Sequence, residues 1–272
     1  MKIKYLGSAA YDAIPALFCE CDNCKHARKV GGKNIRTRTQ AIVDDDLLID
    51  FNADTVAHFL HYGIDEHKID NCLITHSHSD HFYPEDMAIP QYNIHGSHKI
   101  TYHAAQSGYD LINECFAKTP VMFERAAVKL VEPYKIFEAG KYTVLPLPAN
   151  HDPASSPVFY ALEKGGKRML YAHDTGVFDE RVYKALKDFG RLDYISFDCT
   201  GGLTGGWRDG HMCAETDMEV LERLTAAGVA DKNTSVTLCH FSHNGAGSHE
   251  QLAEFGNKHG VAIAYDGMEV EF

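Results

Sequence analysis

The sequence has no run of about 18 consecutive apolar residues, the length that a membrane-spanning helix needs. Its start, Met1 to Gly7, lacks the apolar core of a secretory signal peptide and has the pattern of a first β-strand. Basic residues are in the minority, with 26 Lys and Arg against 38 Asp and Glu, and the net charge is −12. This balance argues against a large nucleic-acid surface, which needs clustered positive charge. We therefore expect a cytoplasmic protein that binds neither membranes nor nucleic acid.

The chain is long and apolar enough to bury a large core as one domain, with 272 residues of which 44% are hydrophobic. Apolar runs of strand length alternate with stretches of helical periodicity, and no linker or repeat separates them. Two hairpins are indicated, one through the acidic turn Asp44-Asp45-Asp46 and one through Gly165-Gly166. The pattern favours a single α/β domain over residues 1–272.

A helix is predicted over residues 52–62 from the spacing of its apolar side chains. This helix is expected to turn Val56, Phe59 and Leu60 toward the core. His58, on the same segment, is expected at the surface.

The strongest chemical signal lies at Leu73–Phe82, where a short apolar strand runs into three histidines and an aspartate. His76 and His78 alternate to the same side of an extended segment, whereas Asp80 and His81 come round the following turn. Imidazole nitrogens and carboxylate oxygens are the ligands that zinc, manganese and similar divalent ions prefer. The spacing H-x-H-x-D-H therefore predicts a metal centre with room for a second ion.

Polar side chains also follow other predicted strands at the point where each strand ends. The full set is His76, His151, Asp174, Asp198 and His240. Strands that end at one edge of a sheet bring residues from distant parts of the sequence together, so we expect these side chains to share one centre. Asp50, at the end of the strand Leu47–Ile49, is predicted to accept a hydrogen bond from a metal-binding histidine.

Eight cysteines in a chain expected to be cytoplasmic favour metal or redox chemistry over disulfides. Three of them, Cys19, Cys21 and Cys24, have C-x-C-x-x-C spacing and can surround one tetrahedral ion together with a fourth ligand from elsewhere. A structural zinc is the preferred interpretation, and free, oxidisable thiols are the alternative.

The histidine motif identifies a resemblance to the metallo-β-lactamase superfamily. Members pack two β-sheets face to face with helices outside, an αββα four-layer sandwich, and hold two metals at one end. The resemblance implies that the first metal is bound by His76, His78 and His151. It implies that the second is bound by Asp80, His81 and His240, with Asp174 bridging the two. The implied cofactors are two divalent ions, zinc or manganese.

The chain also resembles a narrower branch, the cyclic-phosphate phosphodiesterases of carbon–phosphorus lyase pathways. The match includes the three cysteines, the pair His240-x-Ser242-His243, His211 after a loop, and the closing Tyr265-Asp266-Gly267-Met268. In that branch the cysteines and the second histidine hold an additional zinc. The implied ligands here are Cys19, Cys21, Cys24 and His243.

The function implied by the resemblance is opening of a small cyclic phosphate, such as 5-phosphoribosyl 1,2-cyclic phosphate, by a hydroxide that bridges the two metals. Asp80 and Asp174 would act as ligands at the reacting centre. His211 is the candidate proton donor to the leaving alkoxide, and an inert loop histidine is the alternative. We expect a small phosphodiester as the partner and leave a homodimer open.

Three positions depart from the pattern of that branch, and they flank the side where substrate would bind. His173 stands where relatives often have serine, Ala9-Ala10 occupies a loop that is often richer in glycine, and the excursion Gly201–Gly210 with Trp207 has no counterpart. Other reactions of the same fold therefore stay open, namely thioester hydrolysis, ribonuclease processing and β-lactam opening. So do a di-iron redox protein and a carrier or scaffold without activity.

Overall fold

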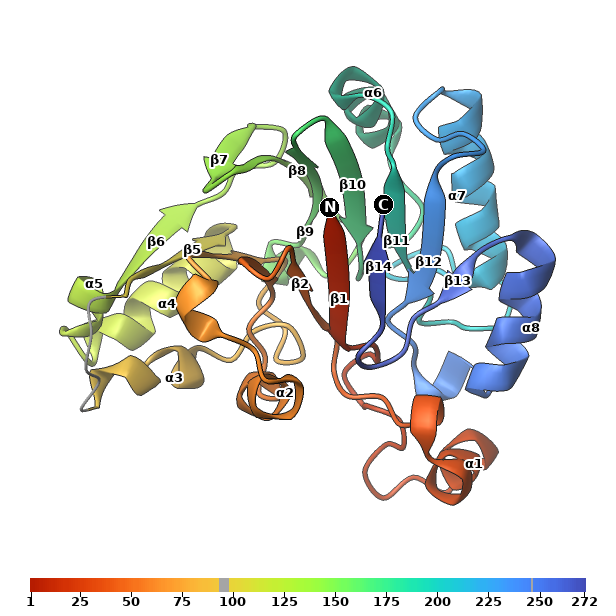
Figure 1. The fold of residues 1–272 in the computed structure, drawn as a ribbon, viewed down its shortest axis with the longest axis horizontal. Coiled ribbons are helices and arrows are strands. Elements are labelled where there is room, and N and C mark those ends of the chain that lie inside the picture. Colours follow the sequence, from red (N-terminus) through yellow and green to blue (C-terminus); the bar gives the residue numbers. More distant parts are fainter. Residues whose placement is uncertain (93–97, 246) are drawn as a thin grey trace.

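Two seven-stranded sheets packed face to face form the centre of the computed structural model, which describes residues 1–92, 98–245 and 247–272 (Figure 1). In spatial order the first sheet contains β14 (Glu269–Glu271), β1 (Lys2–Gly7), β2 (Gln40–Val43), β3 (Leu47–Ile49), β4 (Asn71–Ile74), β5 (Ile100–Ala104) and β6 (Ala126–Leu130). The second contains β13 (Ala262–Ile263), β12 (Ser235–Cys239), β11 (Tyr194–Asp198), β10 (Lys167–Ala172), β9 (Val158–Lys164), β8 (Tyr142–Pro148) and β7 (Phe137–Ala139).

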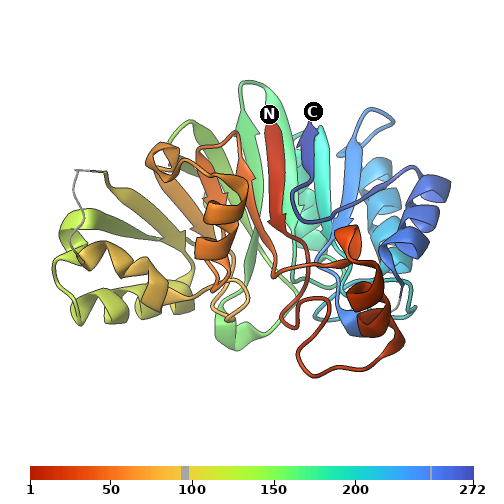
Figure 2. The ribbon, with the colours of Figure 1, turned by 60° about the horizontal axis from the view of Figure 1, so that its bottom comes forward.

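Helices cover the outer face of each sheet, so the predicted αββα sandwich is confirmed (Figures 1 and 2). Those on the side of the first sheet are α2 (Thr55–Tyr62), α3 (Pro84–Met87), α4 (Gln106–Ala117) and α5 (Met122–Arg125). Those on the side of the second are α6 (Glu180–Phe189), α7 (Ala214–Ala226) and α8 (His249–His259), and α1 (Asp22–Val30) lies at the end of the sandwich near α8. Within the described residues, each helix is too short or too polar to cross a membrane.

The strands are apolar on both faces because each sheet packs against its partner on one side and against helices on the other. In β2, Ala41 and Val43 contact the second sheet, whereas Ile42 between them faces the helices. The neighbouring β3 repeats this alternation, with Leu48 turned toward the helices. Side chains alternate across a strand, so a continuous apolar run fills two cores at once.

A buried hydrogen-bond network joins the two sheets at their centre. The hydroxyl of Tyr5 in β1 lies 2.7 Å from that of Tyr194 in β11 and donates to Ser196 Oγ at 2.7 Å. Tyr194 donates to Thr237 Oγ1, and Ser196 Oγ lies 2.8 Å from His173 Nε2. The network therefore reaches the residue that precedes Asp174. His173 is itself buried, and its Nδ1 lies 3.3 Å from Thr39 Oγ1.

The predicted helix over residues 52–62 is present as α2, but its orientation differs from the expectation. Val56 and Leu60 are 44% and 80% exposed, whereas His58 is only 3% exposed. His58 is held on the inner face because its Nδ1 lies 2.7 Å from Gln40 Oε1 and its Nε2 lies 2.7 Å from Thr37 Oγ1. The expected surface position of His58 is wrong, because a ring with two hydrogen-bond partners can be buried.

Both predicted hairpins are confirmed, as β2–β3 and β9–β10. Two elements had not been predicted: α1, which starts inside the cysteine motif with Cys21 as its N-cap, and the last strand, β14. The pairing partner of β14 is β1, from the other end of the chain, so local sequence carries no sign of it.

Removing the hydroxyl of Tyr5 tests the network between the sheets. We expect Tyr5→Phe to lower the free energy of unfolding by about 1–3 kcal/mol, because Tyr194 and Ser196 lose a buried partner. Chemical denaturation measures the change. Tyr11→Phe is the control, since Tyr11 is 59% exposed, and it should stay within about 0.5 kcal/mol of wild type. Equal stability of Tyr5→Phe and wild type would show that the network contributes little.

Candidate metal centre

The centre is assembled from loops that follow strands of both sheets. His76, His78, Asp80 and His81 lie after β4 of the first sheet, and the other residues follow β8, β10, β11 and β12 of the second. Asp174 at φ 50° and His240 at φ 60° in these loops have a left-handed backbone, as does Asp50 at φ 67° directly after β3. Non-glycine residues rarely adopt this conformation, and it is found where the surrounding structure fixes a functional geometry.

The first cluster consists of His76, His78 and His151, whose candidate ligand nitrogens all lie within 4.8 Å of one another. Nε2 of His151 is 3.1 Å from Nδ1 of His78. The ring of His76 lies 4.6 Å from that of His78 and 5.1 Å from that of His151. The three imidazoles named by the resemblance are therefore brought together.

The second cluster consists of Asp80, His81, Asp174 and His240, all buried. Nε2 of His81 is 3.2 Å from Nε2 of His240, and both nitrogens face Asp174. Oδ2 of Asp174 also lies 3.3 Å from Nε2 of His76 in the first cluster. Asp174 thus stands between the two clusters, the position that a bridging carboxylate requires.

Each histidine presents one nitrogen to the centre and is held by a partner at the other nitrogen. The outer contacts are His76 with Thr75 at 3.1 Å, His78 with Asp152 at 3.1 Å, His81 with Asp50 at 2.7 Å, His151 with the carbonyl of Gly210 at 2.9 Å, and His240 with Thr200 at 2.7 Å. Such partners fix the ring orientation and the tautomer of metal-binding histidines. The contact of Asp50 with His81 confirms the prediction that Asp50 holds one of the histidines of the centre. The roles of Asp152, Thr200 and Gly210 had no signal in the sequence.

The inner atoms fit divalent cations. Nε2 of His76 and Oδ1 of Asp174 are buried without a hydrogen bond of acceptable geometry. Four carboxylates, those of Asp50, Asp80, Asp174 and Asp198, are at most 5% exposed. Within the described chain, every ion pair recorded for them is with a histidine. Buried charges need compensation, and imidazole and carboxylate atoms that point at one another supply it by sharing a cation.

The electric field of this centre appears in the pKa values of its groups. Burial disfavours the charged form of His81, but the carboxylates of Asp174, Asp80 and Asp50 outweigh burial and raise the pKa of His81 well above its usual range. Burial likewise opposes ionisation of Asp174, yet His240 and His81 hold its pKa well below the ordinary value. The centre therefore favours ionised carboxylates together with a positive charge next to them.

His211 lies at the edge of the second cluster, on the loop between β11 and α7. Its Nδ1 is 3.0 Å from Asp198 Oδ2, 3.1 Å from Thr200 Oγ1 and 3.2 Å from Asp174 Oδ1. Burial lowers the pKa of His211, but Asp198 and Asp174 prevail and raise it to about 11. The same carboxylates and His240 form a further set of possible ligands with His211. Asp198, which was expected at this edge of the sheet without a specific partner, therefore contacts His211 directly.

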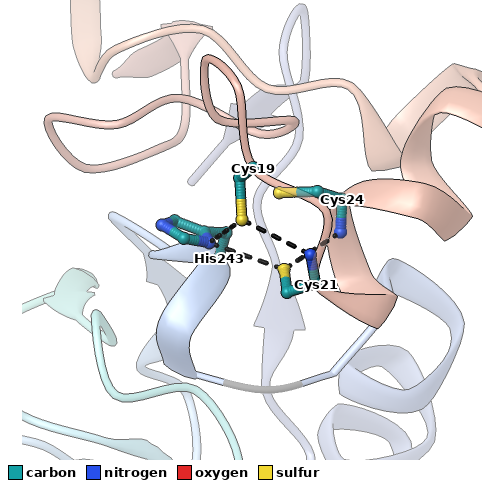
Figure 3. Close-up of side chains that lie close together, drawn as sticks. All are labelled: Cys19, Cys21, Cys24 and His243. Carbon is teal, nitrogen blue, oxygen red and sulfur yellow. Dashed lines mark hydrogen bonds between the residues drawn. The ribbon is translucent and has the colours of Figure 1, made fainter.

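The three cysteines lie around the imidazole of His243 (Figure 3). Nδ1 of His243 is 3.4 Å from Cys19 Sγ and 3.6 Å from Cys21 Sγ, and its Nε2 is 3.5 Å from a carboxylate oxygen of Asp12. Burial raises the pKa of the Cys21 thiol, but His243 and the backbone N–H of Cys24 outweigh it and lower the pKa to about 6. Three sulfurs and one imidazole nitrogen within 4.8 Å fit a tetrahedral zinc ion.

A cavity of about 440 Å³ opens onto both histidine clusters. His78, Asp80, His151, Asp174 and His240 lie in its wall, together with His211. Tyr11 and Trp207 also line the cavity. Trp207 belongs to the excursion that was expected on the substrate side, whereas the sequence offered no sign of Tyr11.

A family model described as the beta-lactamase superfamily domain matches residues 47–240, which include both histidine clusters. A search of curated proteins finds no match. Among solved structures, a diphosphatase from the PhnP family is 20% identical with a TM-score of 0.74, covering 100% of this chain and 98% of the other. Zn²⁺-bound PqqB from Methylobacterium extorquens is 17% identical with a TM-score of 0.74, covering 100% of both chains.

The metallo-β-lactamase fold protein YhfI from Bacillus subtilis is 18% identical with a TM-score of 0.71, covering 100% of this chain and 99% of the other. At such identities these likenesses establish the fold, and all three extend over the whole chain. The family model covers more than half of the sequence and contains the residues gathered in the metal centre. The chain therefore belongs to the metallo-β-lactamase superfamily of metal-dependent hydrolases.

Proposed function

We propose that this protein is a phosphodiesterase that opens a small cyclic phosphate with the help of two divalent ions. His76, His78 and His151 would hold one ion, and Asp80, His81 and His240 the other, with Asp174 shared between them. Bound divalent ions supply an activated water at neutral pH and neutralise charge on a phosphoryl group. A structural zinc would be held by Cys19, Cys21, Cys24 and His243. Zinc and manganese both suit the histidine and carboxylate ligands of the active centre.

The observation that carries the proposal is the position of His211. Its Nδ1 is engaged by Asp198 and Thr200, which leaves Nε2 for a substrate in the cavity. Opening a cyclic phosphate releases an alkoxide, a poor leaving group that gains from protonation. Asp198 and Asp174 favour the protonated imidazole, so His211 is equipped to donate that proton.

Two alternatives from the same fold are less well supported. Thioester hydrolysis releases a thiolate, which leaves without a proton and would make no use of His211. Ribonuclease processing needs basic residues for the phosphate backbone, whereas the residues described in the cavity wall include no lysine or arginine and the net charge is −12. The PhnP-family diphosphatase of similar fold is consistent with phosphate chemistry.

Hydrolysis of bis(p-nitrophenyl) phosphate, compared with the p-nitrophenyl monoester and with a thioester, tests the reaction class. Metal analysis of the same sample measures how many divalent ions are bound and whether they are iron. Bound iron would indicate the di-iron redox protein and not the hydrolase. Turnover of the thioester without turnover of the diester would contradict the proposal.

Replacing the shared carboxylate tests the pair of ions. We expect Asp174→Ala to lose one bound ion and to lose activity by more than the roughly 10- to 100-fold that follows removal of an outer partner of a metal ligand. Metal analysis and diester hydrolysis measure both effects. Asp188→Ala, on the exposed face of α6, is the control and should retain the full metal content and the full rate of diester hydrolysis. Full metal content and full rate in Asp174→Ala would show that Asp174 does not bridge.

Removing one thiolate tests the cysteine site. We expect Cys21→Ser to lose one equivalent of zinc and to unfold at a lower temperature, because a structural zinc contributes directly to folding free energy. Diester hydrolysis should persist in part. Cys115→Ser changes a half-buried thiol far from the cluster and should retain the zinc. A zinc content unchanged by Cys21→Ser would contradict the assignment.

The role of His211 is tested with two leaving groups. We expect His211→Ala to reduce turnover of a cyclic phosphate by roughly 10²–10⁴-fold, the usual contribution of a general acid. Its effect on bis(p-nitrophenyl) phosphate should be much smaller, because nitrophenolate leaves without protonation. Equal losses on both substrates would assign His211 to binding, and no loss on either would return it to an inert loop histidine.

A further inference from the structure

Outside its histidines, the described wall of the active-site cavity has no side-chain cation for a second phosphate group. Among the residues described in its wall, the charged groups outside the histidines are Asp12, Asp80 and Asp174. The stretches outside the described structure, 93–97 and 246, contain no lysine or arginine. A phosphodiester carries one negative charge, which the metal centre can neutralise. A phosphate monoester adds a charge of about −1.5 to −2 at pH 7 and would need a partner of its own.

Three arginines that contact the segment carrying Tyr11 or that adjoin Trp207 are already engaged. Arg38 pairs with Asp54 at 3.0 Å and donates to the carbonyl of Tyr11, and Arg208 pairs with Glu219 at 2.7 Å. Arg36 is 2% exposed and donates to Ser8 and to a backbone carbonyl. Recruiting one of these to a substrate would break an existing pair.

Two acidic side chains at the edge of the cavity add negative charge there. Asp12 lies in the wall with a 38% exposed side chain, and Asp152 beside His78 has a 45% exposed side chain. Like charges brought together at a binding surface cost several kcal/mol, so a dianionic group at this rim is disfavoured.

An aromatic side chain stands where the remainder of a substrate would lie. Trp207 lines the cavity, and its ring centroid is 6.2 Å from that of His211, the proposed proton donor. The indole packs directly against the backbone of Gly201, because a Cβ added at Gly201 would lie only 2.7 Å from Trp207 Cγ. Thr216 Oγ1 holds the carbonyl of Trp207 at 2.8 Å. A ring fixed in this way offers a preformed face for stacking.

The loop that carries Trp207 is tied to the metal centre at its far end. The carbonyl of Arg208 accepts from the N–H of Val177, two residues after Thr175, and the carbonyl of Gly210 contacts His151 Nδ1. These hydrogen bonds fix the loop, and with it Trp207, relative to the first histidine cluster. The excursion Gly201–Gly210, which departs from the phosphodiesterase branch, has the geometry of a substrate-facing wall.

We propose that the substrate is a monoanionic cyclic phosphate whose remaining part is uncharged and presents a flat ring to Trp207, as a nucleoside cyclic phosphate does. This inference rests on the proposed phosphodiesterase function and narrows it. It disfavours substrates with a second phosphate, including 5-phosphoribosyl 1,2-cyclic phosphate. Base stacking on an aromatic side chain supplies affinity without sequence or charge recognition.

A matched pair of probes tests the charge requirement in the metal-loaded wild-type protein. Adenosine 2′,3′-cyclic phosphate is compared with the same compound carrying an added 5′-phosphate. We expect kcat/KM to fall by at least about tenfold with the added phosphate, because its charge has no partner. Equal or higher kcat/KM for the 5′-phosphorylated probe, or a preference for 5-phosphoribosyl 1,2-cyclic phosphate, would overturn the inference. Failure to open any of these cyclic phosphates would instead overturn the proposed function.

Variants of Trp207 test the stacking. Trp207→Ala should raise KM for adenosine 2′,3′-cyclic phosphate by roughly tenfold, in keeping with the loss of one base-stacking contact. It should leave KM for ribose 2′,3′-cyclic phosphate, which has no base, nearly unchanged. Trp207→Phe keeps an aromatic face and should restore most of the affinity. Phe18→Ala removes an aromatic ring that is 99% exposed and outside the cavity wall, and should change neither KM. The same rise in KM for both substrates in Trp207→Ala would overturn the stacking role.

Discussion

Burial of negative charge at one end of the sandwich is the constraint on which the rest of the structure depends. Asp50, Asp80, Asp174 and Asp198 are almost completely buried, and their recorded ion pairs in the described chain are all with histidines. Neutral imidazoles cannot compensate this charge, whereas protonated imidazoles or divalent cations can. The histidine nitrogens that face inward, each with its second nitrogen held from outside, are arranged for cations.

The fold keeps this arrangement rigid by distributing it over both sheets. The H-x-H-x-D-H loop follows β4 of the first sheet, and Asp174 and His240 follow β10 and β12 of the second. The centre therefore exists only while the sheets stay in register, and the hydrogen bonds of Tyr5 with Tyr194 and Ser196 connect them through the core. The left-handed backbone at Asp174 and His240 turns each ligand at the end of its strand, and the packed sandwich sustains that strain.

The cysteine cluster and the active centre share a short segment of chain. His240 contributes to the second cluster and His243, three residues later, to the cysteine cluster. Asp12 connects them from the other side, because it contacts His243 and lies in the wall of the active-site cavity. An ion at the cysteines would thus stabilise the wall that holds Tyr11 as well as the N-terminal segment itself. The cavity combines a cationic centre, once loaded, with an acidic rim and an aromatic face, which suits a substrate with one negative charge.

From local spacing and strand ends the sequence by itself predicted an α/β domain, a metal centre at the H-x-H-x-D-H motif and a metal-binding group of Cys19, Cys21 and Cys24. The αββα layers, the division of the ligands between two ions and the addition of His243 followed from the family resemblance. His76, His78 and Asp80 lie within five residues, and alternation and turn geometry alone place them together. Only the tertiary structure decided what depends on contacts between distant segments. Those contacts bury His58 between Gln40 and Thr37, expose Leu60, and give Asp152 and Thr200 their roles beside histidines. They also place Trp207 in the cavity wall, since its position is set by Gly201 and Thr216 and by no pattern in the loop itself.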